Sequence, residues 1–195
     1  MIAIVDYGVG NICSVRNALA RAGIAEPLYT SDKDVLAAAD KVILPGVGDA
    51  AEAMNALRSR SLDELIPKLR QPVLGICVGA QLMCGHSEEG DVDCLGIFDT
   101  RVCRFPAESG LKVPHIGWNR ISALKSPLFA GLSDGEYVYY VHSFYPSLCH
   151  DTIAATSYGV EFSGALAHDN FYACQFHPEK SGDVGARIIE NFLKL

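Results

Sequence analysis

A cysteine between two glycines is the residue of this sequence best placed for covalent chemistry. Residues 75–79 read G-I-C-V-G, and they follow the apolar run 73–76. This spacing matches the nucleophile elbow, G-x-S-x-G, with Cys77 in the place of the serine. The tight turn leaves no space for Cβ atoms at the flanking glycines, and the N–H groups of a following helix favour the thiolate. The simpler interpretation is a buried cysteine in a glycine-rich turn.

A second group, His177 and Glu179, suits acid–base chemistry. A cysteine nucleophile needs a base or ion-pair partner, and that partner needs a group that orients it. Residues 176–179 read F-H-P-E after a β-rich run. Residues two apart in an extended segment project to the same side, so Glu179 can reach the imidazole. Taken alone the string fits a surface loop, but beside the elbow it predicts a triad of Cys77, His177 and Glu179.

A glycine loop, L-P-G-V-G-D at residues 44–49, is the third candidate. Together with Ala51 it satisfies the dinucleotide-binding pattern G-x-G-x-x-A. That interpretation is disfavoured because Pro45 intrudes, the loop does not follow the first strand, and no acidic residue ends a following strand. The loop is better suited to an oxyanion hole, in which the N–H of Val47 or Gly48 would complement that of Val78.

The three groups must be positioned by strands that alternate with helices. Strands are expected at 2–5, 42–44 and 73–76, and helices at 12–22, 49–57 and 79–83. Cys84 is expected two turns beyond Cys77 on the third helix. Short β-rich runs follow from 96 to 173, and a strand at 171–176 precedes a final helix with Ser181 as its N-cap. This order predicts one α/β domain (1–195) with a mostly parallel sheet and a smaller antiparallel extension.

Composition narrows the class of protein. The 195 residues are 49% hydrophobic, and the net charge is −7 without a basic cluster, so a nucleic-acid binder is disfavoured. No run of about 18 apolar residues predicts a membrane helix. The N-terminus lacks a signal-peptide pattern, so a cytoplasmic location is expected. The seven cysteines contain no C-x-x-C pair, and neither a metal site nor a nucleotide cofactor is predicted.

The chain resembles class I glutamine amidotransferases along nearly its whole length. The strings that carry the resemblance are P-G-V-G at 45–48, G-I-C-V-G-A-Q at 75–81 and F-H-P-E-K-S at 176–181. Within the family, it is most similar to the glutaminase subunits of imidazole glycerol phosphate synthase in histidine biosynthesis. That narrower resemblance rests on D-Y-G-V-G-N at 6–11, P-H-I-G-W-N at 114–119 and V-H-S-F-Y at 141–145. It implies a flavodoxin-like α/β fold.

The resemblance also implies roles for residues around the triad. Cys77 would attack the carboxamide of glutamine, and His177, held by Glu179, would protonate the departing ammonia. The groups that would bind glutamine are Gly46, Gln81, Glu89, His142 and Ser143. For Glu89 a second interpretation, a solvated loop charge, stays open.

A partner chain is implied as well, because 195 residues hold a hydrolase but no synthase domain. The resemblance implies a (β/α)8-barrel cyclase subunit that receives the ammonia. The candidates for the contact face are Asn11, Trp118, Tyr139 and Lys180, although Tyr139 also fits a core strand. Activity is expected to be low until that partner is loaded, with loop 45–48 as the switch. The alternatives are a glutaminase of another synthase, such as pyridoxal phosphate synthase, a stand-alone γ-glutamyl hydrolase, and an inactive interaction subunit.

Overall fold

The computed structural model describes residues 1–8, 10–106 and 110–195, so Val9 of the 6–11 string lies outside the described residues. Helices and strands follow one another through the whole chain. In chain order they are β1 (Ile2–Val5), α1 (Ile12–Arg21), β2 (Leu28–Thr30), α2 (Lys33–Ala38), β3 (Lys41–Leu44), α3 (Ala50–Ser59), β4 (Val73–Ile76), α4 (Val78–Leu82), β5 (Cys84–Ser87), β6 (Val92–Asp93), β7 (Phe98–Arg104), β8 (His115–Arg120), β9 (Tyr137–His142), β10 (Phe144–Pro146), β11 (Thr152–Tyr158), β12 (Val160–His168), β13 (Phe171–Cys174) and α5 (Gly182–Lys194), with short 3-10 turns at Ile66–Lys68, Pro127–Phe129 and Pro178–Lys180, the last labelled η4.

A seven-stranded sheet forms the centre of the molecule. Its strand order is β11-β12-β13-β4-β3-β1-β2. The five strands from β13 to β2 are parallel, while β11 and β12 pair antiparallel at one edge. The prediction of a mostly parallel sheet with a smaller antiparallel extension is therefore confirmed.

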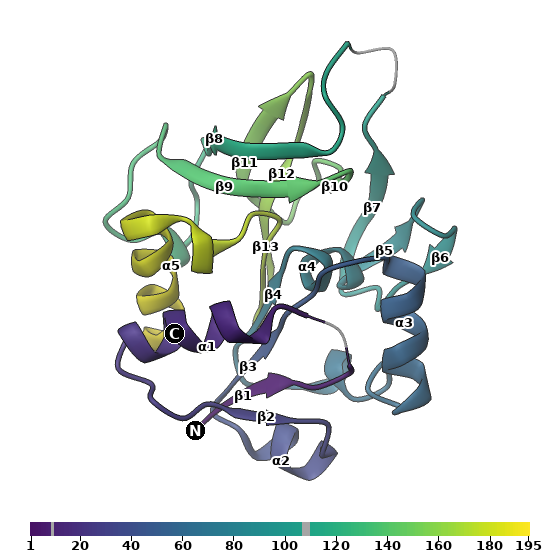
Figure 1. The fold of residues 1–195 in the computed structure, drawn as a ribbon, viewed down its shortest axis with the longest axis vertical. Helices are drawn as coiled ribbons and strands as arrows, with labels where there is room; N and C mark the ends of the chain where they lie inside the picture. Colours follow the sequence, from purple (N-terminus) through teal and green to yellow (C-terminus); the bar gives the residue numbers. More distant parts are fainter. Residues whose placement is uncertain (9, 107–109) are drawn as a thin grey trace.

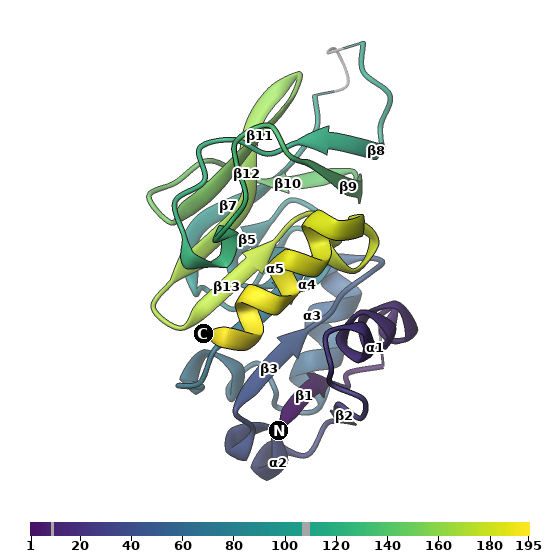
Figure 2. The same cartoon turned by 90° about the vertical axis from the view of Figure 1, so that its left-hand side faces the viewer.

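Helices cover both faces of this sheet. In Figure 1, α1 and α5 lie on one side of the central strands and α3 lies on the other, and Figure 2 shows α5 crossing the face turned to the viewer. Strands covered on both faces must be apolar along their whole length. Accordingly, every residue of β1 and of β4 is buried. Asp49 caps α3 by accepting the N–H of Glu52 at 3.0 Å.

Two smaller sheets extend the molecule beyond the carboxyl ends of the parallel strands. One has the order β10-β7-β5-β6, and the other is the β8–β9 hairpin. The position of Cys84 corrects the prediction that it continues the helix after Cys77. Helix α4 ends at Leu82, and Cys84 begins β5 with its side chain fully buried.

The last helix also departs from its prediction in one detail. Ser181 occupies the N-cap position of α5, but its side chain makes no capping hydrogen bond. Its hydroxyl donates instead to the carbonyl of His177 at 2.6 Å and accepts the N–H of Tyr139 at 2.9 Å. Ser181 therefore joins β9 to the segment that carries His177. Within the described residues, none of the helices combines the length and apolarity that crossing a membrane requires.

Candidate active site

Cys77 lies at the carboxyl end of β4, where α4 begins. Its φ of 54° and ψ of −112° are an uncommon backbone conformation for a residue with a side chain, as a strained elbow requires. Its N–H donates to the carbonyl of Cys174 at 2.8 Å, which fixes the elbow to the end of neighbouring β13. A Cβ at Gly79 would lie 2.0 Å from the carbonyl oxygen of Leu44. One at Gly75 would lie 2.9 Å from the Gly79 oxygen. The predicted steric need for both glycines is confirmed.

His177 reaches the same edge of the sheet from the next strand. Because β13 runs parallel to β4, with Cys174 beside Ile76, the residues after both strands emerge together. The N–H of His177 donates to the carbonyl of Tyr139 at 2.9 Å. Its Nδ1 lies 2.8 Å from Oε1 of Glu179, and both side chains are almost fully buried. The predicted contact between these two residues is present.

The second ring nitrogen of His177, Nε2, is buried and has no hydrogen-bond partner among the described residues. Burial by itself lowers the pKa of His177. The nearby Cys77 sulfur and the Glu179 carboxylate outweigh it and raise the pKa to about 9. The imidazolium therefore persists at neutral pH beside the cysteine, with one N–H free to serve a reacting group.

The glycine loop after β3 packs against the elbow. A Cβ at Gly46 would lie 2.3 Å from the amide nitrogen of Gly79, so Gly46 lies directly on the start of α4. The hydroxyl of Tyr7 donates to the carbonyl of Pro45 at 2.6 Å and holds the first half of the loop. The second half is freer, because Val47 is half-buried and Gly48 is exposed with φ of 92°.

Cys77 and His177 line one cavity of about 250 Å³. Most of the residues proposed to hold substrate or oxyanion line it too. Its walls are Val47, Gly48, Cys77, Val78, Gln81, Glu89, Pro114, Val141, His142, Ser143, Phe144 and His177. Gly46 is absent from this wall, because it is packed against α4, and its neighbours Val47 and Gly48 face the cavity in its place.

The amide of Gln81 is fixed inside the cavity. Its Nε2 donates to the carbonyl of Phe144 and to Oε1 of Gln175, both at 2.9 Å. Gln175 Nε2 lies 3.9 Å from the sulfur of Cys77. The Oε1 of Gln81 is buried and has no hydrogen-bond partner among the described residues. Because a buried unpaired acceptor is costly, this oxygen is a ready acceptor for a ligand N–H.

Glu89 lies where a helix begins, at the edge of the cavity. Its Oε2 accepts the N–H of Ala50, the first residue of α3, at 3.0 Å. The pKa of Glu89 is raised, mainly by partial burial. The hydrogen bond from Ala50 opposes this shift, and nearby Asp49 adds to it. The side chain is thus held against α3, which argues against the interpretation of Glu89 as a freely solvated loop charge.

His142 lines the cavity, and its ring nitrogens are engaged within the protein. Its Nδ1 lies 2.7 Å from the carbonyl of Phe144, and its Nε2 lies 2.9 Å from Nδ1 of His115. Nδ2 of Asn119 lies 3.3 Å from the other nitrogen of His115. Burial lowers the pKa of His142 to about 3 and that of His115 to about 4, so both rings are neutral. Both nitrogens of His142 are engaged within the protein, and its ring supports the cavity wall.

Several supporting residues escaped the sequence reasoning. They are Tyr7, which holds Pro45, Gln175, which orients Gln81, and His115, which supports His142. Tyr7 and His115 belong to the strings at 6–11 and 114–119, so a signal was present for them. Gln175 lies next to the F-H-P-E string, and only the parallel pairing of β4 with β13 shows what it contacts.

The four residues proposed to contact a partner lie on neighbouring elements. Trp118 is 53% exposed and its ring packs edge-on against that of Tyr139, with centroids 5.9 Å apart. Lys180 ends η4, which contacts both α1 and β9, and Asn11 caps α1. Tyr139 is half-buried, so it belongs neither wholly to the core nor wholly to the surface.

A Cys-His-Glu arrangement on this α/β fold defines the class of protein. The class-I glutamine amidotransferase family matches residues 3–195, and the chain belongs to that family. Solved structures agree with the fold. One described as a glutamine amidotransferase has a TM-score of 0.76 and 19% identity, covering 100% of this chain and 98% of that one. PurLQS from Thermotoga maritima has a TM-score of 0.72 and 19% identity, covering 99% and 97%.

Curated relatives are similar over the full length. The chain is 59% identical to the imidazole glycerol phosphate synthase subunit HisH of Bacteroides fragilis, covering 100% of this chain and 99% of the relative. Its identity to the HisH of Escherichia coli K12 is 47%, with the same coverage. The narrower resemblance drawn from the sequence strings is therefore confirmed.

Proposed function

We propose that this protein is the glutaminase subunit of an imidazole glycerol phosphate synthase. It hydrolyses glutamine to glutamate and ammonia and passes the ammonia to a cyclase subunit. One observation carries the chemistry: Cys77 and His177 line the same cavity, and Glu179 contacts the remote nitrogen of His177 at 2.8 Å. The similarity to HisH subunits over the whole chain supports the choice of synthase.

The first half of the reaction forms a thioester. Cys77 Sγ, as thiolate, attacks the side-chain carbonyl carbon of glutamine, and the carbonyl oxygen becomes an oxyanion. The N–H of Val78, at the start of α4, and a second N–H from Val47 or Gly48 stabilise that oxyanion. The C–N bond then breaks, and His177 Nε2 gives its proton to the departing nitrogen, so ammonia leaves. His177 is suited to this step because its pKa of about 9 keeps it protonated at neutral pH.

The second half hydrolyses the thioester. His177 Nε2, now neutral, takes a proton from water while the water oxygen attacks the thioester carbon. The C–S bond breaks, which releases glutamate and restores the thiolate and the imidazolium. Glu179 holds Nδ1 throughout, so it fixes which ring nitrogen faces the sulfur and stabilises the positive ring.

Glutamine is held by polar groups at the far wall of the cavity. The carboxylate of Glu89 pairs with the α-ammonium, which selects an amino acid over a simple amide. Gln81 Oε1 accepts a hydrogen bond from glutamine, and the Ser143 hydroxyl donates or accepts another. The support for this assignment is the unpaired Gln81 oxygen and the contact that holds Glu89 beside α3.

The partner surface is formed by the β8–β9 hairpin, η4 and the start of α1. Trp118 is the anchor of this surface, because a large exposed aromatic ring is typical of interface hot spots. Asn11, Tyr139 and Lys180 surround it. The partner is a (β/α)8-barrel cyclase that forms a heterodimer with this chain. A cytoplasmic location suits the complex, since thiols such as Cys77 stay reduced there.

The test is glutamate release from glutamine, measured with the cyclase and its nucleotide ligand present or absent. Strong activity is expected only with the loaded partner, and none with Cys77→Ser in any mixture. Trp118→Ala should weaken the association of the two chains by about 30-fold or more and leave the fold intact. Arg187→Ala, on the exposed side of α5, is the matched control and should bind the cyclase normally.

Each alternative function predicts a different outcome. Full activity without a partner that still requires Cys77 would identify a stand-alone hydrolase. Activation by the barrel of pyridoxal phosphate synthase, and not by the cyclase, would identify another synthase. Absence of activity in every mixture would leave an inactive interaction subunit. Partner dependence itself is proposed to act on Val47 and Gly48, the freer half of the glycine loop.

A further inference from the structure

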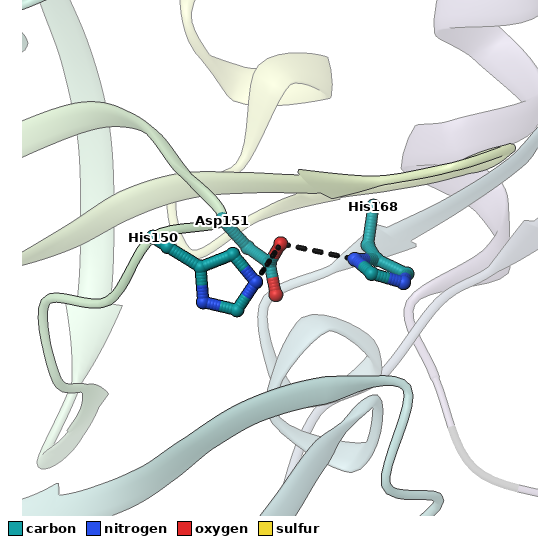
Figure 3. A group of neighbouring side chains, drawn as sticks. All are labelled: His150, Asp151 and His168. Carbon is teal, nitrogen blue, oxygen red and sulfur yellow. Dashed lines mark hydrogen bonds and ion pairs between the residues drawn. The ribbon is translucent and has the colours of Figure 1, made fainter.

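Three polar side chains gather at the end of the central sheet opposite the candidate active site. His150 and Asp151 immediately precede β11, and His168 is the last residue of β12. Antiparallel pairing of the two strands brings them together, and the carbonyl of Asp151 accepts the N–H of Ala167 at 2.9 Å. Figure 3 shows the Asp151 carboxylate between the two imidazole rings.

The geometry of this His-Asp-His cluster is close to that of a metal centre. Asp151 Oδ1 lies 3.1 Å from His150 Nε2 and 3.0 Å from His168 Nδ1. The three ligand atoms all lie within 4.8 Å of one another. In a tetrahedral zinc site with bonds of about 2.0–2.1 Å, neighbouring ligand atoms are about 3.3 Å apart. Small side-chain rotations would reach that geometry, and both rings are exposed enough to make them.

The burial of Asp151 points to a bound cation. Its side chain is only 5% exposed, and its Oδ2 has no hydrogen-bond partner among the described residues. Each ring can donate one N–H to Oδ1, but Oδ2 receives none, so the buried carboxylate keeps an unmet demand for positive charge. A buried charge of this kind is costly unless a counter-charge or a metal ion is present. A divalent cation on Oδ1 would supply that charge.

A fourth residue is placed to support one ligand from behind. If His168 Nδ1 binds a metal, its Nε2–H faces Asp169, whose Oδ2 lies 3.7 Å away. A carboxylate behind a ligating imidazole fixes the ring and increases its basicity, and such groups accompany most histidine metal ligands. The cluster therefore has three candidate ligands and one supporting carboxylate.

We propose that His150, Asp151 and His168 bind a divalent transition-metal ion, Zn²⁺ in the first instance. Two imidazoles and one carboxylate suit Zn²⁺ better than Mg²⁺ or Ca²⁺, which prefer oxygen ligands. Water would fill the remaining position. The site is separate from the glutaminase chemistry, because His168 pairs with Phe171 at the start of β13, whereas His177 follows the other end of that strand. The bound ion would link the start of edge strand β11 to the end of β12.

The test is a calorimetric titration of the chelator-treated full chain with Zn²⁺. One ion per chain is expected to bind with a saturable isotherm. His150→Ala and His168→Ala should each weaken binding by about 100-fold or more, since loss of a supporting group alone typically costs 10–100-fold. Asp169→Asn should weaken it by about 10-fold. Circular dichroism and glutaminase activity of each variant establish that it is folded.

Two controls separate this site from other places where zinc could bind. His86→Ala removes a different imidazole that also contacts two aspartates, Asp91 at 3.2 Å and Asp93 at 3.0 Å, and it should leave the affinity unchanged. Cys77→Ser tests the catalytic thiol, and Co²⁺ in place of Zn²⁺ reports sulfur ligation by a strong near-ultraviolet charge-transfer band. The proposal is overturned by the absence of saturable binding, by full affinity in both histidine variants, or by binding that requires Cys77.

Discussion

Two clusters of histidine and carboxylate lie at opposite ends of β13, and they differ mainly in burial. His177 and Glu179 follow the strand and are both almost fully buried, with a contact of 2.8 Å. His168 precedes the strand and is 46% exposed, and its contact with Asp151 is 3.0 Å. The residue types and distances are nearly the same, so neither decides what each pair can do.

Burial holds His177 and Glu179 in place, whereas the exposed ring of His168 can change its position. A buried imidazole beside a carboxylate and a thiol keeps its proton to high pH and cannot turn, and acid–base catalysis needs both properties. In the exposed cluster, water screens the charges and the two rings can rotate about the one buried group, Asp151. Such rings can exchange a proton for a metal ion. The comparison predicts catalysis at one end of the strand and ion binding at the other.

The largest expected effect on the rate comes from removing the buried imidazole of His177. His177→Ala should lower glutamate release in the loaded complex by about 10⁴-fold or more, because the acid for ammonia and the base for water are removed together. The matched variant at the other end, His168→Ala, should leave the rate unchanged. Steady-state kinetics of both variants checks this, and a similar loss in both would contradict the separation of the two clusters.

Removal of the charge behind the catalytic ring should have the next largest effect. Glu179→Gln is expected to lower kcat by about 10²–10⁴-fold with little change in KM, since the ring is then neither oriented nor stabilised as imidazolium. Asp169→Asn makes the same change behind the exposed ring and should not alter kcat. A raised KM with normal kcat in Glu179→Gln would show that Glu179 serves substrate binding.

The pH profile should show the raised pKa of His177 directly. The folded protein holds this proton up to about pH 9, compared with 6.5 for a free imidazole. Protonated His177 is the active form, so kcat/KM should fall about tenfold per unit as pH rises above about 9. In Glu179→Gln the alkaline limb should move to lower pH. A profile that falls between pH 6 and 7 in the wild type would show that the pair does not retain the proton.

The smallest effect concerns the exposed cluster. With Zn²⁺ at 100 times its Kd, binding should stabilise the chain by about 2.7 kcal/mol and raise the Tm by about 5–10 °C. Thermal unfolding followed by circular dichroism would measure the shift, which should fall to about 1–2 °C or less in His168→Ala. An equal rise in wild type and variant would assign the stabilisation to another site.

Much of the candidate active site could be predicted from the sequence. The glycines at 75 and 79 predict a sharp turn, since no Cβ fits there, and the spacing of His177 and Glu179 predicts a shared side of the chain. Short or half-exposed elements were less visible. No element is predicted for the region of β2 and α2, because β2 has three residues with none buried and α2 has only six residues.

Local sequence patterns do not show all the contacts that a side chain makes. Cys84 has helical spacing from Cys77, but α4 ends early and the chain turns into β5. Ser181 has the position of a helix cap, yet its hydroxyl bonds to His177 and Tyr139. His142 lies in a family string, but its nitrogens bond to Phe144 and His115. For Ser181 and His142, a group far along the chain, Tyr139 or His115, competes with the local one.

The sequence by itself identified the elbow, the candidate triad residues and the alternation of strands with helices, because these patterns depend on neighbours within a few positions. Only the tertiary structure decided which residues meet across the sheet. Parallel pairing of β4 with β13 places His177 beside Cys77, and antiparallel pairing of β11 with β12 places His168 beside Asp151. The physical reason is that strand pairing and burial are set by the whole fold, and burial determines whether a histidine beside a carboxylate is held rigid or can turn toward a ligand.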